Sequence, residues 1–154
     1  MTQVTERTRR SMGRPMPDEA VLDDARGNSR AGTALRALGA LAVLAVGAVH
    51  LEQYFGVHFN VVPVIGPLFV LNFAGAATIA LGLLLPLGRL HVLLALGGIG
   101  LAATSFVFFF ISERRPLFGF QDYGYRPAII IALAAEAAAV VLLGGYLVSR
   151  SRTA

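Results

Sequence analysis

The chain has 154 residues, of which 56% are hydrophobic and only 14% are charged, and its formal net charge is +4. A soluble globular domain carries about 25% charged residues, so this composition is typical of an integral membrane protein. Cysteine is absent from the sequence, which excludes thiol redox chemistry, structural disulfides and thiolate-bound metals.

Seven of the thirteen arginines lie in the first 36 residues, most of them in the polar N-terminal segment, residues 1–32, and the chain has no lysine. This segment has few apolar residues to bury, so we expect a disordered cytoplasmic tail. Arginines beside a membrane helix fit anionic lipid and the positive-inside rule, and we therefore expect no nucleic acid partner. Residues 150–154 are expected to form a second, short cytoplasmic tail.

Four apolar runs follow the tail, each close to the roughly 20 residues that cross about 30 Å of hydrocarbon. They make residues 33–149 a four-span transmembrane domain, with spans at about 33–51, 65–85, 90–111 and 127–148. The predicted fold class is all-α, a bundle of four transmembrane helices with a disordered N-terminal tail. A cleaved signal peptide ending near Ala48 is the alternative for the first run, but the polar segment before it is too long for a usual signal peptide.

The arginine positions predict the orientation, because cytoplasmic loops of membrane proteins carry an excess of basic residues. If the N-terminus is inside, the inner face carries the tail arginines, Arg89 and Arg150, whereas the outer face carries Arg114, Arg115 and Arg126. We therefore expect a multi-pass protein of the cell membrane with both termini in the cytoplasm. Glycine and alanine recur along all four spans and are expected to let the helices pack closely.

Two polar residues inside the spans, Asn72 and Glu136, are the strongest candidates for a functional site. Glu136 follows Pro127 by nine residues. It is thus about 13 Å from the outer end of its helix, and Asn72 lies at a similar depth, roughly 8–13 Å. A charge in hydrocarbon costs a few kcal/mol, so we expect this intramembrane polar pair to face the bundle interior, with Thr104 or Ser105 nearby. A neutral Glu136 that clasps two helices through one hydrogen bond explains its burial equally well.

The two outer connections, around residues 50–63 and 112–127, contain most of the other polar side chains. An aromatic belt at the membrane interface, with arginines reaching lipid headgroups, is one interpretation of these segments. A cap over the mouth of the bundle is the other. The outer-cap candidates are His50, Glu52, Tyr54, His58, Glu113, Arg114, Arg115, Asp122, Tyr125 and Arg126.

The three histidines do not support a haem, because His50 and His91 belong to opposite ends of their spans. His50, Glu52 and His58 are weak candidates for a zinc or copper site, since their spacing matches no strong motif. No phosphate-binding loop or nucleophile motif is found in the sequence. We expect no metal, no cofactor and no catalytic residue.

The stretch from His50 to Asn72, together with Tyr125-Arg126-Pro127 and Glu136, resembles uncharacterised small bacterial integral membrane proteins with four helices. The general outline is also similar to that of DoxX-like proteins. The resemblance covers about residues 35–148. It implies a four-span integral membrane protein, and it carries no assigned activity.

Three functions are therefore expected. The first is a non-enzymatic accessory or assembly component, whose partners are the lipid bilayer and another protein or a second copy of the chain. The second is a small transporter or proton-coupled permease that uses Glu136 as the carrier group. The third is a protein that binds a quinone or another lipophilic ligand beneath the outer cap, near Tyr54, Phe118 and Tyr125.

Overall fold

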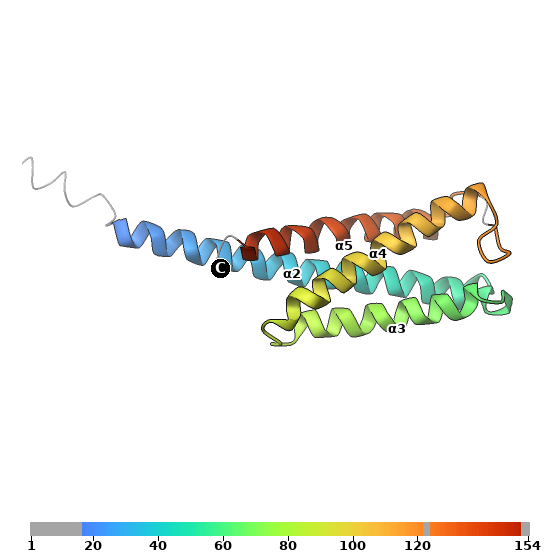
Figure 1. Ribbon diagram of the computed structural model, residues 1–154, viewed down its shortest axis with the longest axis horizontal. Helices are drawn as coiled ribbons and strands as arrows, with labels where there is room; N and C mark the ends of the chain where they lie inside the picture. The colour runs from blue at the N-terminus through green and yellow to red at the C-terminus, as the bar shows by residue number, and fades with distance from the viewer. Residues whose placement is uncertain (1–16, 122–123, 152–154) are drawn as a thin grey trace, which may run out of the picture.

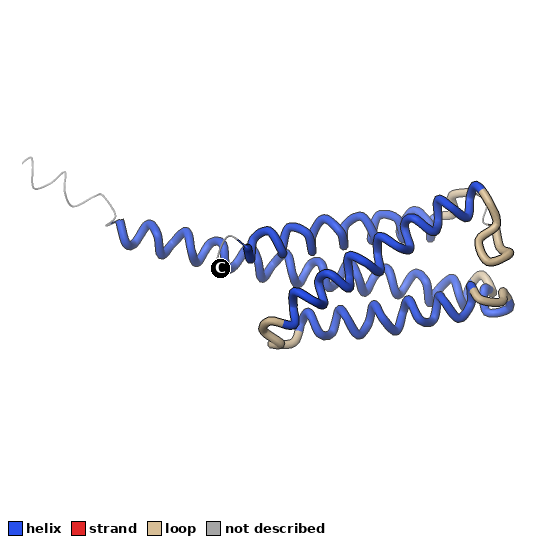
Figure 2. The backbone as a smooth tube through the Cα atoms, in the orientation of Figure 1, coloured by secondary structure: helices blue, strands red, loops and turns tan. Residues whose placement is uncertain are grey.

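The computed structural model describes residues 17–121 and 124–151, and this part of the chain is helical with no β-strand. Figure 1 shows the helices in chain order, and Figure 2 shows the short loops that join them. The elements are α2 (Pro17–Gly56), the 3-10 turn η1 (Phe59–Val61), α3 (Ile65–Leu84), α4 (Leu90–Arg114) and α5 (Pro127–Ser151).

Four helices are long and apolar enough to cross a membrane: Arg30–Gly56 within α2, and the whole of α3, α4 and α5. The chain is a multi-pass helical membrane protein, and the predicted all-α bundle with four spans is confirmed. The helices α4 and α5 end at Arg114 and Ser151, beyond the predicted ends at 111 and 148. Extending a formed helix adds one hydrogen bond per residue, so a helix continues past the apolar run that starts it.

The first helix differs from the expectation of a disordered segment over residues 1–32, because α2 begins at Pro17 and runs without a break into the first span. Proline suits the first position of a helix, and the acidic residues Asp18 and Glu19 that follow it suit the positive end of the helix dipole. The membrane span already forms a helix, so extending it toward Pro17 requires no new helix nucleus. Residues 1–16 lie outside the described part of the chain.

The helices form a four-membered ring in which α2 packs against α3 and α5, and α4 packs against the same two helices. One end of the bundle, here called the turn end, holds residues 85–89 between α3 and α4 together with the end of α5 (Figure 1). The other end, here called the cap end, holds the segments 57–64, 115–121 and 124–126, and the last two of these are together called the second cap segment. In Figure 1, α4 runs obliquely from α3 at the turn end toward α5 at the cap end.

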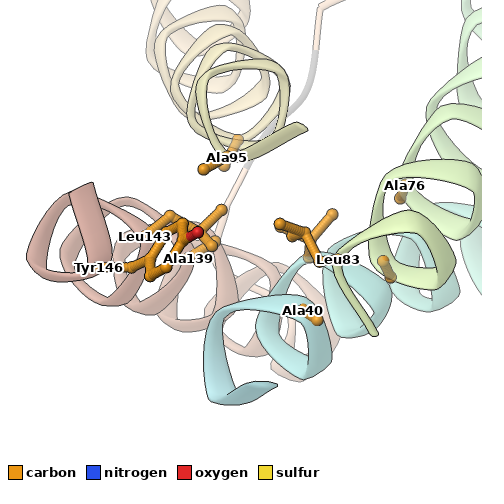
Figure 3. Packing of buried hydrophobic residues seen from close by; sticks show 10 residues of the cluster. Ala40, Ala76, Leu83, Ala95, Ala139, Leu143 and Tyr146 are labelled. Atoms are coloured by element: carbon orange, nitrogen blue, oxygen red, sulfur yellow. The ribbon is translucent and has the colours of Figure 1, made fainter. Parts of the chain in front are cut away.

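The hydrophobic core occupies the turn-end half of the bundle and consists largely of small residues (Figure 3). Ala76, Ala139 and Leu143 are fully buried in it. Gly47 shows how closely the helices approach: a Cβ atom there would lie 2.7 Å from Ala76 Cβ and 3.2 Å from Phe73 Cα. Close approach of backbones is how membrane helices gain packing energy without a hydrophobic drive between them. The predicted role of the small residues is therefore confirmed at this contact.

A polar cluster at the turn end joins three helices. The Nη1 atom of Arg36 on α2 lies 3.1 Å from Nδ1 and 2.6 Å from Nε2 of His91 on α4. His91 Nε2 also lies 2.7 Å from the carbonyl oxygen of Leu85, which follows the last residue of α3. If Nε2 donates to that carbonyl, Nδ1 is left to accept the hydrogen bond from Arg36. The His91 ring thus provides a hydrogen-bond partner both for the Arg36 guanidinium and for the Leu85 carbonyl at the end of α3.

Candidate functional site

A cavity of about 470 Å³ lies between the four helices in the cap-end half of the bundle. Its deep wall is formed by α2, through His50 and Gln53, and by α5, through Ile129, Ala132 and Glu136. The remaining wall comes from α3, α4 and the two cap segments. A volume of this size falls within the range of about 300–1,000 Å³ that is common for small-molecule sites.

The cavity opens sideways between α3 and α4. The lining residues that are exposed at the protein surface come from these two helices: Leu68 and Leu71 from α3, and Gly100, Thr104 and Phe108 from α4. These positions belong to segments long and apolar enough to span a membrane. In a bilayer the opening faces lipid tails, so a molecule can enter from the hydrocarbon without crossing an aqueous phase.

Most of the cavity surface is apolar and aromatic. Five phenylalanines from α3, α4, η1 and a cap segment line it: Phe59, Phe69, Phe108, Phe109 and Phe120. Such walls favour an apolar or aromatic guest, because ring–ring contacts add to the gain from burying apolar surface.

Three polar residues on three helices line the cavity at its turn-end side, and we call Asn72, Ser105 and Glu136 the cavity floor. Asn72 Nδ2 donates a hydrogen bond to Ser105 Oγ at 2.7 Å. One helical turn nearer the turn end, each of their helices places a fully buried alanine in the core. The alanines are Ala76 on α3, Ala102 on α4 and Ala139 on α5. On α3 and α5 the core therefore closes the cavity below Asn72 and Glu136, whereas on α4 the cavity lining continues to Gly100.

Glu136 lies on α5 and is only 3% exposed. Its Oε2 atom has no hydrogen-bond partner among the described residues. The clasp interpretation requires one interhelical hydrogen bond from this carboxyl group, and the described part of the chain provides none to Oε2. Asn72 and Glu136 line the same cavity, but Asn72 donates to Ser105 instead of to Glu136. A buried acceptor without a partner is costly, so this arrangement favours a site over a clasp.

Polar groups also line the cavity near the cap end. His50 Nδ1 lies 2.8 Å from the carbonyl oxygen of Val46, so Nδ1 is the donor and the ring orientation is fixed. Gln53 is 7% exposed, and its Nε2 donates to the carboxylate of Glu52. The other amide atom, Gln53 Oε1, has no partner within the described residues. Ser112 Oγ donates to its own helix at the carbonyl of Phe109, 2.8 Å away.

Aromatic rings from the two cap segments meet over the cavity. The Phe59 ring of η1 lies 5.1 Å from the Phe69 ring on α3 and 5.1 Å from the Phe120 ring, between ring centroids. The guanidinium of Arg126 lies 5.6 Å from the centroid of Phe59, within cation–π range. The His50 ring contacts Phe69 edge to face at 5.0 Å. The cap interpretation of the outer connections thus has a structural basis in Phe59, which the sequence did not single out.

The other outer-cap candidates lie away from the cavity. Tyr125 donates a hydrogen bond to Glu113 at 3.1 Å, and this bond to a carboxylate raises the pKa of the Tyr125 phenol above its usual range. Tyr54 packs edge to face on Phe55. Asp122 lies outside the described residues. The candidates exposed at the protein surface are Glu52, His58, Arg114, Arg115 and Tyr125.

The weak metal candidates are not brought together. His50, Glu52 and His58 do not form a cluster, and the described residues contain no group of three or more histidine, aspartate or glutamate side chains placed to hold a metal ion. On a helix, positions 50 and 52 point to different faces, so His50 lines the cavity while Glu52 is exposed. His58 stands at a positive φ of 63° before η1 and is exposed.

Several cavity residues escaped the sequence analysis. Gln53 follows the charged Glu52 at the end of an apolar run, where polar residues are common, so its position gives no sign of a buried site. Phe59 and Phe69 read as ordinary apolar residues, and only the fold brings them together. A comparison with protein-family models, curated proteins and solved structures gives no match to this chain.

Proposed function

We propose that this chain is a membrane protein that binds a lipophilic molecule with a polar end inside the cavity between its helices. The observation that carries the proposal is the form of the cavity, with apolar walls, a polar floor and an opening between α3 and α4. The ligand's polar end lies at Asn72, Ser105 and Glu136, and its apolar part follows the phenylalanine walls toward the opening. This corresponds to the third function expected from the sequence, with a site deeper than Tyr54, Phe118 and Tyr125.

A transporter or proton-coupled permease is less well supported by the same geometry. Transport requires a path from the cavity to the turn end of the bundle, beyond Glu136. Directly below the floor, Ala76, Ala102, Ala139 and Leu143 are fully buried in the core. The bundle thus offers access from one side, which supports binding in preference to passage. A ligand-binding role is compatible with service as an accessory component of a larger assembly.

We further propose the cell membrane as the location, with both termini in the cytoplasm and the cap end outside. The support is the distribution of arginine: Arg30, Arg36 and Arg89 lie toward the turn end, with Arg150 near the end of α5. In an accessory role, a second protein or a second copy of the chain would pack against the exposed apolar faces of the helices.

The proposal is tested by filling the cavity with a larger side chain. A phenylalanine at position 132 on α5 occupies the space beside Glu136, and Ala132 is a lining residue. The matched control places the same ring at Ala137, an exposed position of the same helix. The wild-type protein and both variants are purified in mild detergent, and native mass spectrometry records the lipophilic molecules that remain bound. We expect bound small molecules in the wild type and Ala137→Phe but not in Ala132→Phe. Equal retention by all three proteins would overturn the proposal.

A further inference from the structure

We propose that the ligand carries a hydroxyl group that donates a hydrogen bond to the cavity floor, as a lipophilic phenol or quinol does. A molecule whose polar end only accepts hydrogen bonds fits this floor less well. The inference rests on the proposed binding function and specifies the chemistry of the ligand.

The two buried atoms of the floor that lack a partner among the described residues are both oxygens, and both can accept a hydrogen bond. Glu136 Oε2 and Asn72 Oδ1 are both buried without a partner among the described residues. One N–H of the Asn72 amide nitrogen is engaged, since it donates to Ser105 Oγ at 2.7 Å. A ligand hydroxyl supplies the donor that these oxygens lack, whereas a carbonyl or ether oxygen adds one more acceptor beside a carboxyl group.

The position of the floor fixes the direction of the ligand. The fully buried Ala76 and Ala139 lie one turn below Asn72 and Glu136 and close the cavity there. The walls nearer the opening are aromatic, and they include Phe108 at the exposed edge of α4. A hydroxyl-bearing ring at the floor with an apolar tail toward the opening satisfies both surfaces at once.

A second unpartnered acceptor offers an internal comparison. Gln53 Oε1 is also buried without a partner among the described residues, but it belongs to the cap-end side of the cavity. The Gln53 amide is held by its bond to the Glu52 carboxylate. If the hydroxyl binds at the floor, removing the acceptor of Gln53 leaves the choice between donor and acceptor ligands unchanged.

The experiment uses two probes, 4-octylphenol and its methyl ether 4-octylanisole, in which a methyl group replaces the hydroxyl hydrogen. Apparent dissociation constants for both probes are measured by native mass spectrometry with the full-length protein in mild detergent. One hydrogen bond gained at a buried acceptor predicts that the phenol binds about five- to tenfold more tightly than the ether. The variant Glu136→Leu should reduce this ratio to about one, while Gln53→Leu should keep it.

Three results would overturn the inference or its basis. Equal binding of the two probes by the wild-type protein, with both weakened by Ala132→Phe, would refute the hydroxyl preference and leave the binding function standing. Loss of the preference in Gln53→Leu but not in Glu136→Leu would move the hydroxyl away from the floor. If Ala132→Phe weakens neither probe, the proposed binding function itself fails. A variant Glu136→Gln that folds and binds, but with a reduced ratio, would support the inference if Glu136→Leu does not fold.

Discussion

Asn72 on α3 donates a hydrogen bond to Ser105 on α4, with 2.7 Å between Nδ2 and Oγ. The bond crosses between the two helices whose exposed residues form the opening of the cavity. It therefore ties the two sides of the opening together at the level of the floor. Loss of this bond affects both the stability of the bundle and the shape of the cavity.

The first prediction concerns this bond. Replacing Ser105 with alanine removes the acceptor of Asn72 and should lower the free energy of unfolding by about 0.5–1.5 kcal/mol. The neighbouring Thr104 is exposed on the same helix, and Thr104→Ala should change the free energy by less than about 0.5 kcal/mol. Unfolding by sodium dodecyl sulfate in mixed micelles measures both variants. Equal losses for the two would show that the bond adds nothing specific.

The second prediction concerns helix contact at a glycine. In Gly47→Ala the new methyl group would lie 2.7 Å from Ala76 Cβ, so α2 and α3 must move apart. We expect a loss of about 1–3 kcal/mol from this overpacking. A Cβ atom at Gly144 meets nothing within 4 Å, so Gly144→Ala should be neutral or slightly stabilising. Unfolding by sodium dodecyl sulfate measures the free energy of unfolding of both variants. No loss in Gly47→Ala would contradict the close approach of α2 and α3.

The third prediction concerns the cluster at the turn end. His91→Phe deprives both the Arg36 guanidinium and the Leu85 carbonyl of a partner, at an expected cost of about 1–3 kcal/mol. Arg36→Met keeps the bond between His91 and Leu85, so it should cost less than His91→Phe does. The order of the two losses is the test. If Arg36→Met is the more damaging variant, the ring is not the shared partner described here.

The fourth prediction concerns backbone strain before α3. Val64 has φ 69° and ψ −54°, and Ile65 N donates to the carbonyl of Pro63 at 2.8 Å, which is a strained γ-turn. A β-branched residue at positive φ costs about 1–3 kcal/mol, so Val64→Gly should stabilise the protein or leave it unchanged. Val61→Gly, at an exposed position without positive φ, should destabilise it by about 0.5–1 kcal/mol. Val61→Gly should thus lower the thermal unfolding temperature while Val64→Gly does not, and equal losses in the two variants would argue against strain at Val64.

Much of the architecture could be predicted because membrane spans are encoded locally. An apolar run of about 20 residues is enough to identify a span, and a lone polar residue in it is conspicuous. Asn72 and Glu136 were found in this way, and the structure places both on one cavity. The sequence predicts at most one helical turn in the tail, near Asp18–Ala25, whereas α2 is continuous from Pro17, since a helix can extend from a span into a segment that would not fold alone.

The cavity itself could not be predicted from the sequence. It depends on the oblique path of α4 and on contacts such as that of Gly47 with Ala76, which join residues far apart in the chain. The burial of Phe59 depends on η1, which lies between positive φ angles at His58 and Val64. A histidine or a valine in the sequence does not predict a positive φ, because glycine is the residue that favours this conformation.

Glu136 faces a cavity open to lipid, although the residue is only 3% exposed at the protein surface. Photolabelling with a lipid-soluble alkyl diazirine tests it, because the activated probe is trapped by carboxyl groups. Glu136 is the sole carboxylate in α5, so an adduct in this helix is readily assigned by peptide mass spectrometry, with the exposed Glu52 as a positive control. We predict an adduct on Glu136 in the wild type and in Ala137→Phe, and its loss in Ala132→Phe. Labelling of Glu52 with no adduct on Glu136 in the wild type would contradict the account.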